Sequence, residues 1–505
     1  MAFLALDIGS TELKAALYGQ AGNPIAYHAI EYPHVSATDR DPGLDPEVLW
    51  KTVREAIASV VRRSRKERVR AAAISSHGES FVPINKAGEP LRSFLLNVDS
   101  RATAEMQWFV HKFGVAYLYK LTGLPPHPMY TLPKIAWLRA NDPRLFGKAK
   151  KFLCVEDYLL HRAGVDACIG SSLAARTLAM DLKSEQWSPE LLDSAGISEA
   201  ALSRIVPAGQ PLGTGSRKAM QALHLPKDTV WISGGHDQSC GALGGGALWE
   251  GNIVVGTGTF ESLSVPLNQP LASDLMQKAN IPCGRHAAPG GFLALAYAPG
   301  GILLRWFRDQ FGQSLLAQAA KLKSNVYDLL LQTFPQEPTG LLAFPYFLGT
   351  GTPWLDSEAR GAIVGLTSTT SRETMMKALL EGVTFEVRWN LELLESAGIS
   401  IQRIFAVGGG AKSSAWLQLK ADIFGREVVV VPGEASCRGA AICAAVGNGT
   451  YKSHFEAVRQ MVKEGPSYYP RPDPESRYRE LFSQYKEIAR KLYGFEFPAL
   501  HRVSL

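Results

Sequence analysis

The sequence predicts an α/β protein of two domains, and three observations support this fold class. The chain has 505 residues, which is more than one domain usually holds. Short apolar runs typical of buried strands alternate with stretches in which apolar residues recur at helical spacing. Two hairpin patterns with glycine and hydroxyl residues at their tips lie far apart, at 4–19 and 251–265. One such hairpin in each half indicates a weak internal duplication and predicts domains at 1–248 and 249–505.

Composition and cysteine usage narrow the functional classes. Hydrophobic residues make up 46% of the chain and charged residues 20%, an ordinary globular balance, and the net charge of +6 is mild. The six cysteines lie far apart without a CxxC pair, which argues against a disulfide framework or a zinc site and favours a reducing cytoplasm. We expect no membrane segment, because no apolar run approaches roughly 18 residues. The first strand begins almost at Met1, so no signal peptide is expected.

The first hairpin has a tip that suits a nucleotide phosphate. Its first apolar run ends in Asp7, and Gly9, Ser10 and Thr11 follow before a second apolar run. Gly9 lets the backbone approach a ligand closely, and the hydroxyls of Ser10 and Thr11 can donate to phosphate oxygens. Lys14 adds a positive charge, and the carboxylate of Asp7 suits Mg²⁺ held through water. The alternative is an ordinary hairpin turn without a ligand.

A helix is predicted after this hairpin. Asp45 and Pro46 are typical N-cap and first-turn residues, and apolar residues at helical spacing continue to about Arg65. The densest basic run of the chain, 62–68, falls at the end of this helix. We interpret the run as solvated helix surface, so no nucleic-acid partner is expected.

Polar clusters follow two predicted strands of the first half. A short buried strand leads to His77, Gly78 and Glu79, and the apolar run at 94–96 is predicted as a second strand that leads to Asp99. Side chains at the carboxyl ends of strands are where α/β folds place ligands. The alternative for each cluster is a capped loop.

A third strand, at 230–232, leads to His236, Asp237 and Gln238. A carboxylate at this position can accept a hydroxyl proton as a general base, or it can simply cap the helix that follows. From Cys240 onward small residues dominate, which predicts a helix packed closely on a neighbour.

The second half repeats the phosphate-hairpin pattern and adds a glycine turn. The second hairpin has Gly-Thr-Gly at its tip, at 256–258. A long helix is predicted at 375–394, and a strand at 404–407 feeds a glycine-rich turn at 408–414 and a helix from about Ala415. A glycine turn between strand and helix presents N–H groups and a positive helix dipole to an anion or a polar ring.

Five separated motifs follow one another along the chain, namely DIGST at 7–11, HGES at 77–80, GHDQ at 235–238, GTGTF at 256–260 and GGGAKSS at 408–414. The ordered set resembles the FGGY family of carbohydrate kinases, within the actin/Hsp70-like ATPase superfamily, and it spans essentially the whole chain. The resemblance implies two ribonuclease H-like domains with a cleft between them, and transfer of the γ-phosphoryl group of ATP to a hydroxyl of a ketose or related sugar or polyol. ATP, Mg²⁺ and a small-molecule sugar are the implied ligands, and a homodimer is allowed.

The resemblance also implies roles for individual residues, with Asp237 as the general base. The acceptor-side residues are His77, Gly78, Glu79, Asp99, His236, Asp237 and Gln238. The ATP-side residues are Gly9, Ser10, Thr11, Lys14, Gly256, Thr257, Gly258, Gly301, Gly409, Gly410 and Ser414. The carboxylates placed near Mg²⁺ are those of Asp7 and Asp237.

Departures from the family pattern fall in the sugar pocket. Asn97 stands where members commonly have Trp, and Met129 where a tyrosine is expected. Glycerol kinases have Arg at position 78 and xylulokinases have Met-His at 78–79, whereas this chain has Gly78-Glu79. Parts of the chain resemble deoxyketose kinases and parts resemble xylulokinases, so the sugar stays open. Arg101 and Lys134 are either substrate contacts or structural partners.

Two other functional classes are alternatives to a carbohydrate kinase. A non-kinase ATPase of the actin/Hsp70-like type would not need the acids Glu79, Asp99 and Asp237. A dinucleotide oxidoreductase needs its glycine motif at the start of a helix, but the glycines at 256–258 lie in a hairpin pattern. The kinase is therefore the favoured function.

Overall fold

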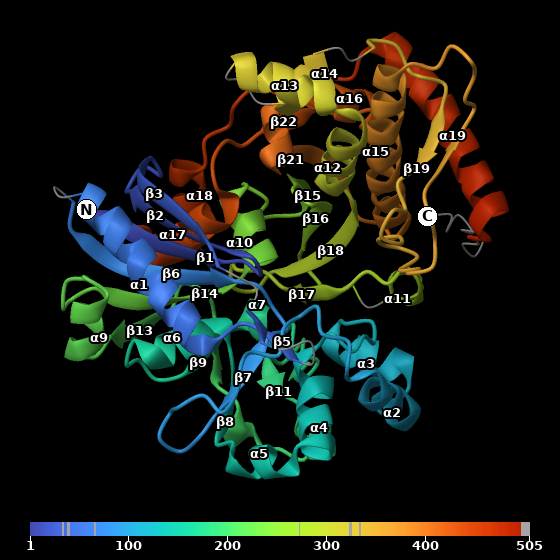
Figure 1. Ribbon diagram of the computed structural model, residues 1–505. Helices are drawn as coiled ribbons and strands as arrows, with labels where there is room; N and C mark the ends of the chain where they lie inside the picture. Colours follow the sequence, from blue (N-terminus) through green and yellow to red (C-terminus); the bar gives the residue numbers. More distant parts are fainter. Residues whose placement is uncertain are drawn as a thin grey trace.

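The computed structural model describes residues 1–32, 35–37, 41–64, 67–271, 273–322, 326–332 and 335–495. Two lobes are visible in Figure 1, each built around its own sheet. The amino terminus lies at the edge of one lobe, and the last described helix lies along the far side of the other. This arrangement confirms the predicted α/β class with two sheets.

The first sheet has six strands in the order β13-β14-β6-β1-β2-β3. The first predicted hairpin forms β1 and β2, and Asp7 lies opposite Lys14 in their antiparallel register. Strands β1, β6 and β14 run parallel, so their carboxyl ends meet at one edge. The strands are β1 (Ala2–Ile8), β2 (Glu12–Gly19), β3 (Pro24–Glu31), β6 (Val69–Ser76), β13 (Pro211–Thr214) and β14 (Val230–His236).

The second sheet has seven strands in the order β17-β18-β16-β15-β21-β22-β23. The second predicted hairpin forms β15 and β16, and β15 runs parallel to β21. The hairpin therefore occupies the same place in its sheet as β1 and β2 do in theirs, which explains the repeated sequence pattern. The strands are β15 (Gly251–Thr257), β16 (Phe260–Leu267), β17 (Cys283–Arg285), β18 (Phe292–Pro299), β21 (Ile401–Gly408), β22 (Val428–Val430) and β23 (Ser467–Tyr468).

Helices surround the first sheet and build a helical region at one end of the first lobe (Figure 1). The carboxylate of Asp45 accepts hydrogen bonds from the first-turn amides of the first helix, as predicted. These helices are α1 (Pro46–Arg63), α2 (Thr103–Phe113), α3 (Val115–Thr122), α4 (Thr131–Asn141), α5 (Pro143–Lys148), α6 (Val155–Arg162), α7 (Ser171–Ala174), α8 (Pro189–Ala195), α9 (Arg217–Ala222) and α10 (Asp237–Gly244).

The second lobe contains the longest helices of the chain, including the predicted helix near 375–394. The helices of the second half of the chain are α11 (Asp274–Lys278), α12 (Gly301–Phe311), α13 (Gln313–Leu322), α14 (Val326–Gln332), α15 (Arg372–Ser396), α16 (Ser414–Phe424), α17 (Ala435–Gly447), α18 (His454–Met461) and α19 (Pro472–Tyr493). Of these, α17 and α18 pack in the first lobe. The remaining short strands are β4 (Val35–Ala37), β5 (Asp41–Gly43), β7 (Phe81–Ile84), β8 (Lys151–Cys154), β9 (Cys168–Gly170), β10 (Met180–Asp181), β11 (Gln186–Trp187), β12 (Arg204–Val206), β19 (Leu342–Phe344) and β20 (Ala362–Val364).

The prediction of a strand at 94–96 is wrong. The run at 94–96 makes only isolated bridges, in which Phe94 pairs with Leu44 and Leu95 pairs with Phe81. The apolar side chains are buried, which produced the strand-like pattern, but their neighbours along the chain do not continue a ladder. The segment is therefore a buried connection that leads to Asp99.

Helices α10 and α17 cross where the two lobes meet. A Cβ on Gly244 would lie 1.9 Å from the carbonyl oxygen of Ala435, and a Cβ on Gly439 would lie 1.9 Å from that of Cys240. Only glycine permits this approach, which confirms the predicted small-residue helix contact. Although it comes late in the chain, α17 packs on β1, β6 and β14 of the first sheet. The division of the chain at residue 248 remains a prediction.

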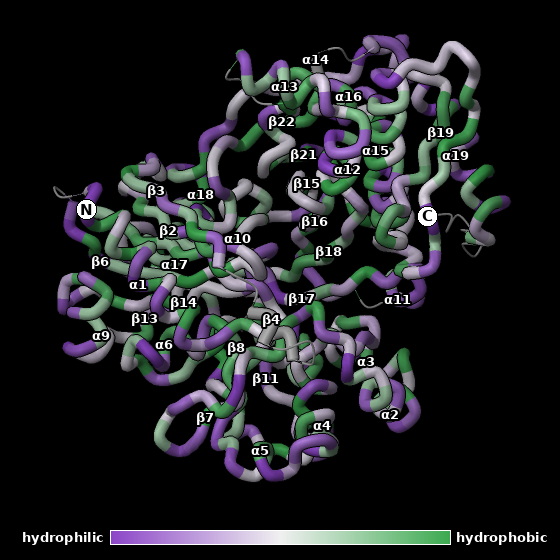
Figure 2. The backbone as a smooth tube through the Cα atoms, in the orientation of Figure 1, coloured by the Kyte–Doolittle hydropathy of each residue, from purple (hydrophilic) through white to green (hydrophobic). Residues whose placement is uncertain are grey.

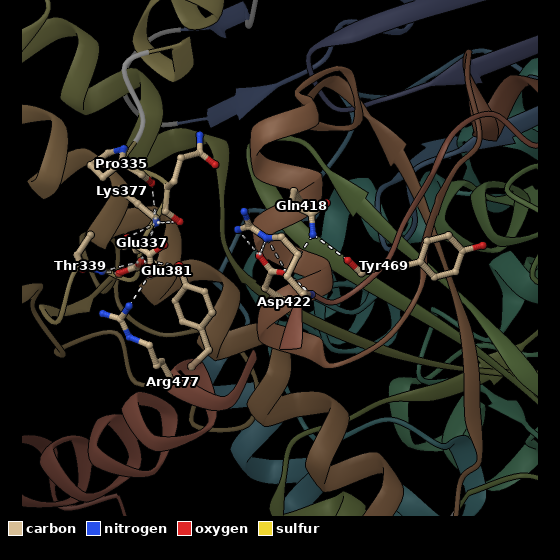
Figure 3. A network of polar contacts seen from close by, with 12 residues as sticks. Pro335, Glu337, Thr339, Lys377, Glu381, Gln418, Asp422, Tyr469 and Arg477 are labelled. Atoms are coloured by element: carbon tan, nitrogen blue, oxygen red, sulfur yellow. Dashed lines mark hydrogen bonds and ion pairs between the residues drawn. The ribbon is translucent and has the colours of Figure 1, made fainter. Parts of the chain in front are cut away.

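Apolar residues concentrate along the strands and the buried helix faces, while loops and outer helix surfaces are hydrophilic (Figure 2). In the second lobe a buried polar network joins α15 and α19 to a preceding loop (Figure 3). Lys377 donates to the carbonyl oxygens of Pro335 and Glu337 at 2.7 and 2.6 Å, and the hydroxyl of Tyr478 donates to Glu381 at 2.8 Å. None of the described helices is long and apolar enough to cross a membrane.

Candidate active site

The ends of three parallel strands bring the polar clusters of the first half together. In the register of the sheet, Asp7 of β1 pairs with Ser75 of β6, and Ser75 pairs with Gly235 of β14. The hydroxyl of Ser75 donates to a carboxylate oxygen of Asp7 at 2.8 Å. Asp237, which follows β14, therefore starts its helix at the same edge of the sheet as Asp7.

The first hairpin turn is held by one hydrogen bond within its backbone and one from a neighbouring side chain. The amide of Gly9 donates to the carbonyl oxygen of Glu12 at 2.9 Å, and the hydroxyl of Tyr32 donates to the carbonyl oxygen of Gly9. Ser10 is half-buried and Thr11 is exposed, so both lie at the surface of the turn. Their predicted contact with phosphate remains a prediction.

Lys14 carries an ion pair to the other half of the chain. Its ammonium lies 2.8 Å from the carboxylate of Glu434, the residue before α17. Burial lowers the pKa of Lys14, but the carboxylates of Glu434 and Asp7 outweigh that effect and raise it above its ordinary value. Lys14 is therefore a cation beside the first turn, although it is not free of partners.

Asp237 lies at the first position of α10. Its carboxylate accepts the amide of Gln238 at 2.6 Å, and Nε2 of His236 lies 3.3 Å away. The side chain keeps 24% of its surface exposed, so a ligand can reach it. Burial, together with the charges of Asp7 and Glu79, raises the pKa of Asp237 to about 8.

Asp7 shares this electrostatic environment. Burial raises its pKa to about 6, although Lys14 and the hydroxyl of Ser75 act in the opposite direction. The charge of Asp7 also contributes to the raised pKa of Asp237. No group of three metal-ligating side chains occurs among the described residues, so a cation here would take these two carboxylates plus water or phosphate oxygens.

Glu79 is buried and held in an unusual backbone conformation. Its φ of 66° lies in the left-handed region, which is sparsely populated for a residue with a long side chain and is often found at ligand sites. The hydroxyl of Thr131 donates to the Glu79 carbonyl oxygen at 2.9 Å. Both Nε and Nη2 of Arg176 lie 2.6 Å from one Glu79 carboxylate oxygen.

His77 and Gly78, two neighbours of Glu79, contribute to the packing and hydrogen bonding around it. His77 uses both ring nitrogens within the protein, on the carbonyl oxygen of Ile8 at 3.0 Å and the hydroxyl of Ser80 at 2.9 Å. Burial lowers its pKa, so the ring is neutral. A Cβ on Gly78 would lie 3.0 Å from Cβ of Arg176 and 3.1 Å from the ring of His236. Gly78 thus allows these two side chains to approach.

Asp99 and its neighbours form a second polar group. The Asp99 carboxylate pairs with Nε of Arg101 at 2.7 Å, and the Arg101 guanidinium lies 4.8 Å from the centre of the Trp137 ring. Lys134 is fully buried and donates to the carbonyl oxygen of Leu96 at 2.7 Å. Burial lowers the pKa of Lys134 to about 8, although Glu79 and Asp99 act in the opposite direction.

The second hairpin turn contacts the other predicted ATP-side glycines. The amide of Gly301, at the start of α12, donates to the carbonyl oxygen of Gly258 at 2.9 Å. A Cβ on Gly410 would lie 2.1 Å from Cγ2 of Thr257. The glycine turn with Gly409 therefore packs directly on the second hairpin, and Ser414 begins α16 just beyond it.

The hydroxyl of Thr257, one of the predicted ATP-side residues, has partners within the protein. Its hydroxyl accepts a hydrogen bond from Lys420 and donates to Glu261 at 3.2 Å, and Lys420 lies 2.7 Å from Glu261. All three side chains are buried beneath the turn. Phosphate contacts at this turn would therefore come from its backbone and not from this hydroxyl.

Sequence reasoning missed three buried residues, namely Arg176, Lys420 and Glu156. Arg176 pairs with Glu79, and Lys420 supports the second turn. The carboxylate of Glu156 accepts the amides of Gly170 and Gly234. None of them belongs to a short motif, so nothing in the local sequence could have identified them.

Two sheets of related topology, with glycine turns at both hairpins and carboxylates beside one of them, define a two-domain phosphotransferase of the actin-like type. Models of the FGGY family of carbohydrate kinases match residues 2–244 (N-terminal domain) and 251–447 (C-terminal domain). The chain belongs to this family. It is therefore an ATP:carbohydrate phosphotransferase, as the five motifs implied.

Relatives and solved structures agree with this assignment. The chain is 31% identical over 498 residues to a gluconokinase from Bacillus subtilis (strain 168), covering 97% of this chain and 96% of the relative. It is 29% identical to a xylulose kinase of the same organism, with 96% of each covered. The structure of ligand-bound xylulose kinase from Lactobacillus acidophilus aligns with a TM-score of 0.86 at 25% identity, covering 97% of this chain and 98% of that one. Plasmodium falciparum glycerol kinase with ADP shares the fold, with a TM-score of 0.85 at 18% identity over 98% of this chain and 99% of that one.

Proposed function

We propose that Asp237 is the general base of this carbohydrate kinase. The observation that carries the proposal is the position of its partly exposed carboxyl at the strand edge beside Asp7, among the acceptor-side residues. A pKa of about 8 suits a base that works near neutral pH, because a stronger base drives proton transfer better.

In the proposed phosphoryl transfer, one proton moves, one bond forms and one bond breaks. A hydroxyl of the acceptor gives its proton to the Asp237 carboxylate, and its oxygen forms a bond to the γ-phosphorus of ATP. The bond from that phosphorus to the bridging oxygen of ADP breaks at the same time. Because the transition state is loose, positioning of the two substrates and stabilisation of charge supply most of the rate. We assign the ATP phosphates to the turns at 9–11 and 256–258, with Gly301, Gly409, Gly410 and Ser414 on the nucleotide side.

The residues at the strand edge fit Mg²⁺. Burial raises the pKa of both Asp7 and Asp237, so a nearby positive charge would stabilise their carboxylates, which supports a cation here. Bound there through water, Mg²⁺ would neutralise charge on the transferring phosphoryl group. The Ser75 hydroxyl keeps the Asp7 carboxylate oriented, and Lys14 adds a fixed positive charge beside it.

Candidate acceptors follow from the relatives, which are named for gluconate and xylulose. Glu79 and Asp99 are the carboxylates that we assign to acceptor hydroxyls, with His236 and Gln238 beside them. A cytoplasmic location and a homodimer remain predictions.

The substitution Asp237→Asn tests the base directly. Asn keeps the shape and caps a helix as well as Asp, but it cannot take a proton. ATP and acceptor should still bind within a few-fold, while kcat should fall about 10²–10⁴-fold. Binding is measured by calorimetry alongside steady-state turnover. Normal turnover by a folded, substrate-binding variant would end the assignment, and ATP hydrolysis that no acceptor stimulates would favour a non-kinase ATPase.

A further inference from the structure

Asp7 and Lys14 face each other across the first hairpin, yet they are not paired. The two residues lie directly opposite in the antiparallel register of β1 and β2, so their side chains lie on the same face of the sheet. Opposite charges in such positions attract each other. The ammonium of Lys14 lies instead 2.8 Å from Glu434 and 3.8 Å from Glu12. Among the residues that the structure describes, no hydrogen bond or ion pair joins it to Asp7.

Glu434 is the closer of the two competing carboxylates, and its position is fixed. Its carboxylate accepts a hydrogen bond from Lys14, whereas Glu12 lies too far away for one. As the residue before α17, Glu434 could cap the first amides of that helix, but its side chain makes no such bond. The hydroxyl of Tyr18 donates to the Glu434 carbonyl oxygen at 3.3 Å. The backbone of Glu434 is thus held in place while its carboxylate is turned to Lys14.

Stability does not explain this ion pair well. The side chains of Lys14 and Glu434 keep 26% and 41% of their surface exposed, and pairs as exposed as this contribute little to stability. The start of α17 also lies at the candidate active site, because the hydroxyl of Ser436 donates to the carbonyl oxygen of Asp237 at 3.2 Å. The position of the pair therefore points to a role in the site.

The carboxylate of Asp7 has one oxygen available for a ligand. The hydroxyl of Ser75 donates to Oδ1, and Oδ2 accepts no hydrogen bond among the described residues. Lysine has a flexible stem and three donors, so an ammonium released from Glu434 could move to this oxygen. It would then occupy a position that suits the water shell of Mg²⁺, and its charge would repel the cation.

We propose that Glu434 is a positioning residue, which holds the Lys14 ammonium away from Asp7 and so keeps the Asp7 carboxylate open for Mg²⁺. This inference rests on the proposed function, in which Asp7 and Asp237 hold the cation through water. The ammonium gives one of its three donors to Glu434, so it can still contact a phosphate of ATP. Glu434 itself contacts neither the cation nor a substrate in this role.

A crystal structure of Glu434→Ala without nucleotide tests the displacement. With its partner removed, Nζ of Lys14 should lie about 2.7–3.2 Å from the Asp7 carboxylate. Glu434→Gln keeps an acceptor but not the charge, and its structure serves the same purpose if the alanine variant does not fold. An ammonium that stays away from Asp7 in the variant structure would overturn the inference.

Nucleotide affinity with and without Mg²⁺ gives a second readout that needs no turnover. The dissociation constant of a non-hydrolysable ATP analogue is measured by calorimetry in EDTA and again in Mg²⁺. The ratio of the two constants is the contribution of the metal, and the lost charge of Glu434 enters both measurements. In Glu434→Ala this ratio should fall about 10-fold below that of the wild type, a coupling typical of residues in one network.

A double variant separates the action of Glu434 through Lys14 from a direct effect on the metal. When Glu434→Ala is combined with Lys14→Met, no ammonium remains to occupy Asp7. The ratio should then return to within about 2-fold of that for Lys14→Met alone. A ratio that stays low would mean that Glu434 acts on the metal directly, and the inference would be wrong.

Glu12→Gln is the matched control, because it removes a carboxylate near Lys14 that makes no hydrogen bond to it. Its ratio should stay within about 2-fold of the wild type. A fall equal to that of Glu434→Ala would show a general effect of charge and would overturn the positioning role.

Failure of this inference and failure of the proposed function give different results. If the wild type phosphorylates an acceptor but the metal contribution is the same in Glu434→Ala, the kinase stands and the positioning role is lost. If the wild type neither binds the analogue nor consumes ATP with any acceptor, the proposed function fails, and the inference fails with it.

Discussion

At the scale of a single residue, Asp237 as the proposed general base faces two opposing demands. A general base must be ionised to accept a proton, yet burial and the nearby carboxylates of Asp7 and Glu79 favour its neutral form. This conflict is typical of functional sites, where groups are held in states that a purely structural position would avoid. The conflict has a measurable consequence for stability.

The carboxyl of Asp237 should destabilise the fold increasingly as the pH rises from about 4 to 8. Its pKa is 3.8 ordinarily and about 8 in the folded protein, so in this window the folded state holds a proton that the unfolded chain has released. The unfolding free energy of the wild type therefore falls with pH, by up to about 1.4 kcal/mol per unit. Asn does not titrate, so Asp237→Asn should raise Tm more at pH 8 than at pH 5.

Thermal unfolding of wild type and Asp237→Asn at both pH values measures the effect. Asp193→Asn is a matched control, because that side chain lies outside the site and should give the same Tm difference from wild type at both pH values. An equal gain for Asp237→Asn at the two pH values would mean that the carboxylate is already ionised in the free protein.

At the scale of secondary-structure elements, one buried carboxylate connects β14, which precedes Asp237, to the segment that precedes α7. Glu156 of α6 accepts the amide of Gly170 at 2.8 Å and the amide of Gly234 at 2.9 Å. Gly234 lies in β14, three residues before Asp237, and Gly170 ends β9 just before α7. The amide of His236 also donates to the hydroxyl of Ser172 in α7, at 3.0 Å. These contacts fix the two elements relative to each other.

Glu156→Gln should reduce turnover as well as stability. A glutamine side chain has one acceptor oxygen, so one of the two backbone amides loses its partner, at a cost of about 1–3 kcal/mol. The end of β14 would then shift, and misplacement of a reacting group by about 1 Å can reduce the rate about 10²-fold. We expect kcat to fall about 10-fold or more, with the KM for ATP nearly unchanged.

Asp157→Asn supplies the control, because Asp157 is the adjacent buried carboxylate and its partner is the hydroxyl of Ser203 instead. It should lower Tm as Glu156→Gln does while kcat stays near wild type. Equal losses of kcat in the two variants would reduce Glu156 to a purely structural residue.

At the scale of the whole molecule, local patterns predicted the sheets and turns but not the contacts between them. Both hairpins were predictable because each is a continuous stretch with its turn residues at the tip. Arg176 pairs with a residue 97 positions away, and Lys420 with one 159 positions away. No local pattern records such pairs, because only the assembled fold brings them together.

The wrong prediction of a strand at 94–96 and the unpredicted packing of α17 have the same cause. The run at 94–96 is buried and apolar, but ladder formation depends on a neighbouring strand that the sequence does not reveal. Helix α17 comes from the second half of the chain, yet it packs on the first sheet through Gly439 and its small neighbours. Burial was predictable at both places, whereas the packing partner was not.

We propose that both predicted phosphate turns and Asp237 act on one ATP and one acceptor. A crystal structure with Mg²⁺, a non-hydrolysable ATP analogue and an acceptor that the wild type phosphorylates tests it most directly. We expect phosphates against the turns at 9–11 and 256–258, and an acceptor hydroxyl about 2.6–3.2 Å from the Asp237 carboxylate. A nucleotide bound at only one turn, with the acceptor hydroxyl out of reach of Asp237, would contradict it.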